Sequence, residues 1–134
     1  MTSLSAELYW LIVTAIFTSL QWMPQIVQRI LEMKPYAAFR DPYHDVTTQA
    51  SWAQRSIRAH ANSVANLVTF CAFVLVLEMT GTGNAVTAIA AKFYFISRVV
   101  HFVVYTLGVP WLRTPVYLFG LGCQLLIAWV VLNG

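Results

Sequence analysis

The sequence predicts an all-α integral membrane protein, a four-helix bundle formed by a single domain that covers residues 1–134. Its composition indicates this class: 59% of the 134 residues are hydrophobic, only 10% are charged, and the mean hydropathy is +0.67. A soluble domain usually carries about 25% charged residues, which cover its water-facing surface. A soluble four-helix bundle, the alternative that we considered, is therefore disfavoured.

The length of the apolar segments predicts the number of helices. A helix needs about 20 largely apolar residues to span the hydrocarbon core of a bilayer. Four segments approach that length: Leu8–Arg29, Ser56–Met79, Val86–Leu107 and Pro115–Leu132. The first segment lacks the basic start and the small-residue cleavage site of a secretory signal, so we expect it to be the first transmembrane helix.

The first segment becomes polar towards its end. Gln21, Gln25 and Gln28 recur at i, i+4 and i+7, so they share one face of a helix. Pro24 removes a backbone hydrogen bond, which predicts a kink in this helix. The glutamines either form interhelical hydrogen bonds or line a polar site.

Residues 33–50 separate the first two segments. Their two prolines and their polar residues predict a loop, followed by a second helix that begins near Thr48 or Gln49. His44 lies between Asp41 and Asp45 in this loop. Because no second histidine is nearby, a solvated loop is favoured over a metal site.

Two short turns separate the later segments. Gly-Thr-Gly-Asn at residues 81–84 predicts the first turn, and Gly-Val-Pro at residues 108–110 predicts the end of the third helix. Pro115 lies near the predicted start of the fourth helix, where proline is tolerated. Arg113 is therefore expected in the turn before that helix.

Four small residues in the predicted helices suit a packing role. Cys71 and Cys123 lie in apolar stretches, where cysteine usually behaves as a small hydrophobic residue. Neither cysteine lies near a base or in a paired spacing, so a disulfide or a catalytic thiol is disfavoured. Gly120 and Gly122 permit close packing of the fourth helix.

The charged residues collect at the two ends of the predicted bundle. The connections between helices 1 and 2 and between helices 3 and 4 carry Arg29, Lys34, Arg40, Arg55 and Arg113. The opposite end holds Glu7 and Glu78. The positive-inside rule places the basic connections in the cytoplasm and both termini on the non-cytoplasmic side. The net charge of +3 indicates contact with membrane lipids and disfavours nucleic acid as a partner.

A polar stripe opens the second predicted helix. Arg55, Arg58 and Asn62 follow the spacing i, i+3 and i+7, so they lie on one helical face. His60 points away from that face, towards a neighbouring helix or subunit. A charge in the bilayer interior costs from a few to more than about 10 kcal/mol. Such side chains are therefore expected to line a cavity with protein walls.

A second stripe lies at the cytoplasmic end of the third predicted helix. Tyr94, Arg98, His101 and Tyr105 follow i, i+4, i+7 and i+11 along three turns. Both stripes are at the same depth, so they can converge on one cavity between helices.

Such a cavity would be net positive, with Arg29 and Arg113 at its rim and no acidic residue in either stripe. Guanidinium groups bind carboxylates bidentately, so the expected ligand is an anion. The opening towards lipid suits an apolar second substrate. Two alternatives stay open: the arginines extend to the interface and bind phospholipid, or the chain is a transporter, which the absence of repeated halves disfavours.

The two stripes also resemble known motifs. Residues 55–62 are similar to the pattern Arg-x-x-Arg-Ala-His-x-Asn, and residues 98–105 are similar to Arg-x-x-His-x-x-x-Tyr. Leu-Arg-Thr-Pro follows at residues 112–115. By these motifs the chain resembles bacterial-type members of the MAPEG family, the membrane-associated proteins of eicosanoid and glutathione metabolism.

The resemblance implies a homotrimer in a bacterial inner membrane, with glutathione as co-substrate between neighbouring subunits near the cytoplasmic face. It implies transferase or peroxidase activity on lipophilic electrophiles or hydroperoxides. Arg113 is the implied catalytic residue, which would stabilise the glutathione thiolate. The implied ligands of glutathione are Arg58, Asn62, Arg98, His101 and Tyr105. Arg29 corresponds to the family pattern in position only, and Arg55 is expected at the anion site from its place in the first stripe. His60 and Tyr94 are expected in supporting positions.

Two places depart from the glutathione-using members. Ala65 stands where they carry an acidic residue that holds the amino end of the tripeptide. Tyr117 and Leu118 stand near the places of an arginine and a tyrosine early in the fourth helix. A non-catalytic membrane module that binds lipid or another anion is therefore the alternative function.

Overall fold

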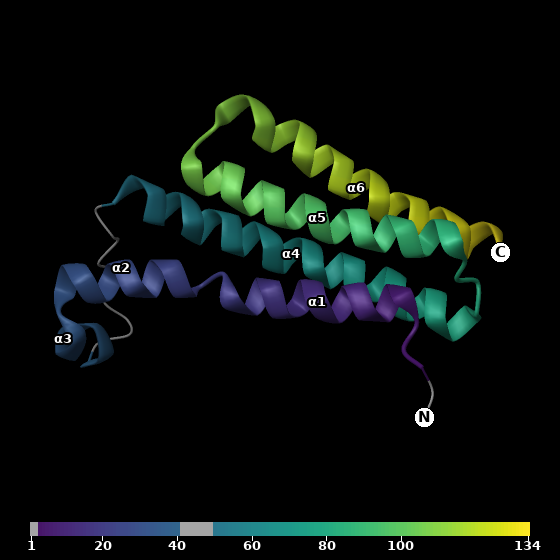
Figure 1. Ribbon diagram of the computed structural model, residues 1–134, viewed down its shortest axis with the longest axis horizontal. Helices are drawn as coiled ribbons and strands as arrows, with labels where there is room; N and C mark the ends of the chain where they lie inside the picture. The colour runs from purple at the N-terminus through teal and green to yellow at the C-terminus, as the bar shows by residue number, and fades with distance from the viewer. Residues whose placement is uncertain (1–2, 41–49) are drawn as a thin grey trace.

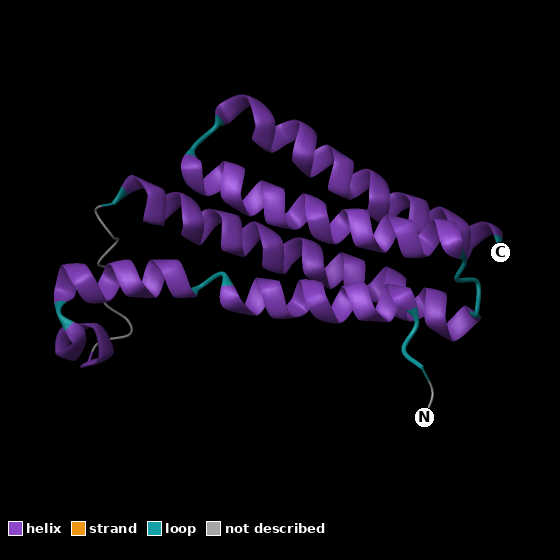
Figure 2. Ribbon diagram, viewed as in Figure 1, coloured by secondary structure: helices purple, strands orange, loops and turns teal. Residues whose placement is uncertain are grey.

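The computed structural model describes residues 3–40 and 50–134, which form six α-helices (Figure 1). They are α1 (Ala6–Leu20), α2 (Met23–Met33), α3 (Pro35–Arg40), α4 (Ser51–Thr80), α5 (Ala85–Leu107) and α6 (Pro110–Asn133). Figure 2 shows only helices and connecting turns in this part of the chain. The all-α prediction is thus confirmed.

Four stretches are long and apolar enough to cross a membrane: α1 with α2, α4, α5 and α6. They lie side by side as a bundle, and the two ends of the chain are at the same end of it (Figure 1). The predicted four-helix membrane bundle is therefore confirmed.

The first span is broken at the place where proline predicted a kink. α1 ends at Leu20, and the Gln21 N–H bonds the Thr18 carbonyl at 3.2 Å. α2 begins at Met23, with Pro24 in its first turn. Pro24 has no N–H to offer the Leu20 carbonyl, so the helical hydrogen-bond ladder stops and restarts.

The connection between the first two spans differs from the predicted loop. Residues 35–40 form the short helix α3, which begins with Pro35. Proline suits the first position of a helix because its fixed φ is already helical. α4 begins at Ser51. We predicted that the second membrane helix begins near residues 48–49, and we considered a metal site around His44. Both predictions concern residues 41–49, which lie outside the described residues.

The prediction for the start of the fourth membrane helix was wrong. α6 begins at Pro110, and Pro115 lies inside it. Arg113 therefore belongs to the first turns of α6 and not to a loop. Pro110 suits the first helical position, and Pro115 removes only the hydrogen bond to the carbonyl of Trp111, whose side chain is exposed.

The two predicted turns are present and have glycine where the backbone requires it. α4 ends at Gly81 with φ +64°, and α5 ends at Gly108 with φ +75°. Asn84 caps α5 by accepting hydrogen bonds from the N–H groups of Val86 and Thr87. These left-handed and capped ends terminate one helix and start the next within a few residues.

Two carboxylates tie the helices together at the end that holds the chain termini. Glu7 is buried and accepts a hydrogen bond from the Thr87 hydroxyl of α5. The Ser5 hydroxyl donates to Glu78 at the end of α4. The acidic residues predicted at this end therefore connect α1 with both of its neighbours.

The apolar core lies between these carboxylates and the basic end. It consists of Leu11, Phe70, Val74, Leu77, Ala90, Ala91, Tyr94 and Ile127. The Tyr94 ring stacks on Phe70 with 3.9 Å between ring centroids. Tyr94 thus belongs to the core, and its supporting role at the site stays a prediction.

A glycine allows a buried arginine to lie between α5 and α6. A Cβ atom at Gly120 would lie 2.6 Å from Arg98 Nη2 and 2.5 Å from Ser97 Oγ. A Cβ atom at Gly122 would meet nothing within 4 Å. Within the described chain, close packing therefore depends on Gly120 and not on Gly122.

This difference predicts the effects of two matched substitutions. Gly120→Ala is expected to lower the free energy of unfolding by about 1–3 kcal/mol, because the new methyl group displaces packed side chains. Gly122→Ala is expected to leave it unchanged or raise it by up to about 1 kcal/mol, through the higher helix propensity of alanine. Denaturation in detergent, followed by circular dichroism, measures both. Equal effects would contradict the packing role of Gly120.

Candidate functional site

A cavity of about 220 Å³ lies at the basic end of the bundle, beside the turn between α5 and α6. Arg55 and Arg58 of α4, Tyr105 of α5 and Arg113 of α6 line it, together with residues 108–110 of the turn. No acidic side chain from the described residues lines this cavity. We call it the basic cavity.

Arg55 anchors one wall of the basic cavity. Its Nε donates to the Thr106 carbonyl at 2.9 Å, and Thr106 belongs to the last turn of α5. Carbonyls in a last helical turn lack intrahelical partners and carry partial negative charge, so an arginine stabilises them. A Cβ atom at Gly108 would lie 2.9 Å from this Nε. Glycine at the turn therefore serves two needs, a positive φ and room for Arg55.

Arg58 and Arg113 contribute the exposed positive charges of the basic cavity. Both side chains are exposed, and neither pairs with a carboxylate among the residues that the structure describes. The Arg113 guanidinium carbon lies 5.6 Å from the centroid of the Tyr105 ring, a cation–π distance. This contact holds Arg113 over the cavity and leaves its N–H donors available to a ligand.

Arg98 and His101 lie deeper, in a buried layer next to the basic cavity. Arg98 is 1% exposed, and its guanidinium lies 5.4 Å from the ring centroids of both Tyr94 and Tyr117. Its nitrogens have no hydrogen-bond acceptor within the described part of the chain. The charge is thus stabilised by two aromatic faces.

His101 connects this buried layer to the basic cavity. Its ring centroid lies 5.6 Å from that of Tyr105 and 6.1 Å from that of Tyr117. Tyr105 faces the basic cavity, whereas His101 is buried. The stripe predicted on α5 therefore runs from the core, through the buried layer, to the cavity wall.

A matching stripe on α6 was not predicted. Arg113, Tyr117 and Gly120 are spaced i, i+4 and i+7, and they meet the α5 stripe in antiparallel order. Tyr105 meets Arg113, and Arg98 meets both Tyr117 and Gly120. The spacing was visible in the sequence. Because the helix was predicted to start at Pro115, Arg113 was assigned to the preceding turn and was not connected with Tyr117 and Gly120.

The other predicted site residues do not line the basic cavity. The carbonyl and the side-chain oxygen of Asn62 accept hydrogen bonds from Asn66 at 2.8 and 3.3 Å. Arg29 is half-buried on α2. His60 is half-buried on α4. One chain therefore brings four of the predicted site residues to one cavity, and the ligand roles stay predictions.

Comparison with known proteins identifies the family of the chain. The model of the MAPEG family matches residues 8–133, which is nearly the whole chain. No curated protein and no solved structure gives a significant match. The family match spans all four membrane helices and both polar stripes, so the resemblance predicted from the motifs is confirmed. The chain belongs to the MAPEG family.

Proposed function

We propose that this membrane protein is a homotrimeric glutathione transferase or peroxidase that acts on lipophilic electrophiles or hydroperoxides. The observation that carries the proposal is the basic cavity, where three arginines and a tyrosine from three helices meet. Guanidinium groups bind carboxylates through paired hydrogen bonds. Glutathione offers two carboxylates and a thiol, so its chemistry suits such a site.

The size of the basic cavity favours a site shared between subunits. At about 220 Å³ it is smaller than the 300–1,000 Å³ that is typical of pockets for drug-sized ligands. Its two exposed arginines, Arg58 and Arg113, face outward from a single chain. A neighbouring copy would complete the walls around the tripeptide. In that arrangement Arg29 and Asn62 could contribute from either side of the shared site, whereas Arg98 and His101 would support the basic cavity from the buried layer behind it.

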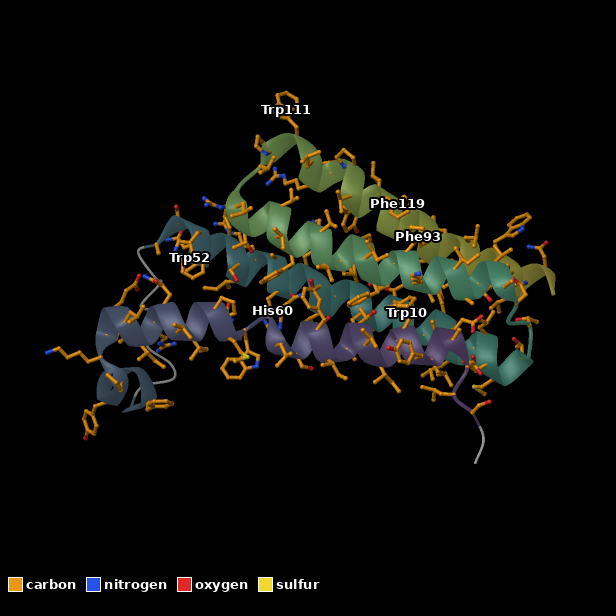
Figure 3. All side chains as sticks on the ribbon, viewed as in Figure 1. Trp10, Trp52, His60, Phe93, Trp111 and Phe119 are labelled. Carbon is orange, nitrogen blue, oxygen red and sulfur yellow. The ribbon has the colours of Figure 1, made fainter. Side chains whose placement is uncertain are left out.

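A lipid-facing surface is available for the second substrate. An apolar cavity of about 600 Å³ lies between α5 and α6. Phe93 and Phe119 line it from the two helices, with 6.0 Å between their ring centroids (Figure 3). A lipophilic substrate that is dissolved in the bilayer can reach this surface without crossing water.

The proposed chemistry uses Arg113 to stabilise sulfur as a thiolate. The thiol proton leaves to water, sulfur bonds to the electrophilic carbon, and the leaving group departs with its electron pair. With a hydroperoxide, sulfur attacks the terminal oxygen, the oxygen–oxygen bond breaks, and the alcohol is released. A second glutathione then converts the oxidised sulfur to the disulfide and water.

The proposed orientation places the basic cavity at the cytoplasmic face of a bacterial inner membrane. The end with Arg55, Arg58 and Arg113 is basic, whereas the end with Glu7 and Glu78 is acidic. Basic ends of membrane helices remain in the cytoplasm during insertion. Both termini would then lie on the non-cytoplasmic side.

Arg113→Ala tests the catalytic assignment. With glutathione and a hydrophobic electrophile in excess, the variant is expected to lose about 10²–10³-fold in turnover, as when a preorganised charge-stabilising donor is removed. Lys92→Ala, which removes an exposed cation of α5 outside the basic cavity, serves as the control and should retain full turnover. Conjugate formation and thiolate absorbance are the two measurements. Wild-type protein that neither binds millimolar glutathione nor forms thiolate would exclude the proposed function.

A second candidate function is a non-catalytic module that binds a lipid headgroup or another anion. Ala65 favours it, because no carboxylate is present there to hold the ammonium group of glutathione. Ala65 follows Arg58 by seven residues, so it lies on the same face of α4.

Ala65→Glu separates the two functions. If glutathione is the ligand, the new carboxylate should raise its affinity about tenfold, because it supplies the missing partner of the ammonium group. Calorimetric titration with glutathione and with inorganic phosphate measures both affinities. Val64→Glu is the control, because Val64 is exposed at nearly the same depth but lies on a different face of α4 from Arg58. An unchanged glutathione affinity in Ala65→Glu, together with phosphate binding that depends on Arg58, would favour the anion module.

A further inference from the structure

The end of α2 and the short helix α3 form a corner that lies outside the bundle. Figure 1 shows α3 turned away from the long axis of α2, on the side opposite α4. Three large side chains of this corner are exposed: Leu31 at 73%, Tyr36 at 77% and Phe39 at 76%. We call residues 31–39 the α2–α3 corner.

Helix length places this corner at the level of the lipid headgroups. The first span, Ala6–Met33, contains 28 residues. At 1.5 Å per residue it is about 42 Å long, whereas the hydrocarbon core is about 30 Å thick. A bilayer with its headgroup layers measures about 40–45 Å. The chain therefore reaches the outer part of the headgroup layer at the residues where it turns sideways.

Two exposed tryptophans mark the same end of the bundle as an interface. Trp52 lies in the first turn of α4 and Trp111 in the first turn of α6 (Figure 3). They are 37% and 86% exposed. Tryptophan and tyrosine are enriched where membrane meets water, because their rings are apolar and carry a polar atom. The α2–α3 corner lies at the same end of the molecule as these two tryptophans.

The side chains of the corner suit insertion into such a layer. Tyr36 and Phe39 are three residues apart on α3, so they lie on neighbouring positions of one helical face. In water this face would expose two aromatic rings. At the membrane surface the rings lie between headgroups, and the tyrosine hydroxyl stays in contact with water.

The charge of the segment favours an anionic lipid surface. Residues 29–40 contain three basic residues, Arg29, Lys34 and Arg40, and one acidic residue, Glu32. Lys34, at the corner itself, has φ +64° and ψ 151°, a backbone conformation that is rare for residues other than glycine. Contacts that compensate for this strain are expected where the corner meets its partner.

We propose that the α2–α3 corner is an interfacial anchor that inserts Tyr36 and Phe39 among the headgroups of an anionic membrane leaflet. The proposal goes beyond the proposed function, since it requires neither glutathione nor catalysis. The partner is the bilayer surface itself. The anchor fixes the depth of α2 and, through it, the end of the first span.

Depth measurements on spin-labelled protein in nanodiscs test the anchor. Cys71→Ala and Cys123→Ala provide the background, and single cysteines at Phe39, Ile16 and Ser3 carry the label. Ile16 is exposed in the middle of α1 and reports the bilayer interior, whereas Ser3 lies before α1 and reports water. The label at residue 39 is expected to be more accessible to oxygen, and less accessible to a water-soluble nickel chelate, than the label at residue 3.

The lipid dependence provides a second readout. In nanodiscs with phosphatidylglycerol, Lys34→Gln is expected to lower the inserted fraction of the label at residue 39 about fivefold, with no change in purely zwitterionic nanodiscs. The proposal is overturned if the label at residue 39 is as accessible to the nickel chelate as the label at residue 3. Spin–spin broadening between labels of neighbouring copies would also overturn it, because it would identify the corner as a contact between subunits.

The unmodified protein allows the same question without substitutions. Hydrogen exchange of residues 31–39 is expected to be slower in phosphatidylglycerol nanodiscs than in zwitterionic nanodiscs. Equal exchange in the two lipids would contradict an anchor that recognises anionic headgroups.

Discussion

A buried arginine constrains how the last two helices of the bundle pack. Arg98 is almost fully inaccessible, and two tyrosine rings replace the water that would otherwise stabilise its charge. Gly120 leaves room for the guanidinium, because a Cβ atom there would lie 2.6 Å from Arg98 Nη2, and α5 and α6 approach closely at this point. The same packing of α5 against α6 brings Tyr105 to Arg113 at the wall of the basic cavity. The cavity at the surface thus depends on a charge in the interior.

The sequence was sufficient for the fold because apolar length and composition determine membrane helices. It was less informative where two local signals competed. Pro110 and Pro115 are both compatible with a helix start, and only the packing of α6 decides between them. The six residues of α3 have no periodic pattern long enough to distinguish a helix from a loop. Both errors concern the ends and connections of helices, where boundaries depend on tertiary contacts.

The candidate site could be predicted in part from helical spacing. Periodicity correctly placed Arg98, His101 and Tyr105 along one side of α5. It does not determine how neighbouring helices are rotated or shifted, so it did not separate the buried layer from the basic cavity. It also left Tyr117 without a role, although this residue contacts Arg98.

The distribution of acidic and basic residues along the bundle has an electrical consequence. Glu7 and Glu78 lie at one end, and Arg55, Arg58 and Arg113 lie about one membrane thickness away at the other. The molecule therefore carries a permanent dipole along the membrane normal. A transmembrane voltage stabilises one orientation of such a dipole and destabilises the inverted one, by about 2.3 kcal/mol for each elementary charge moved through 100 mV. A voltage that is negative on the arginine side would favour the same orientation as the positive-inside rule.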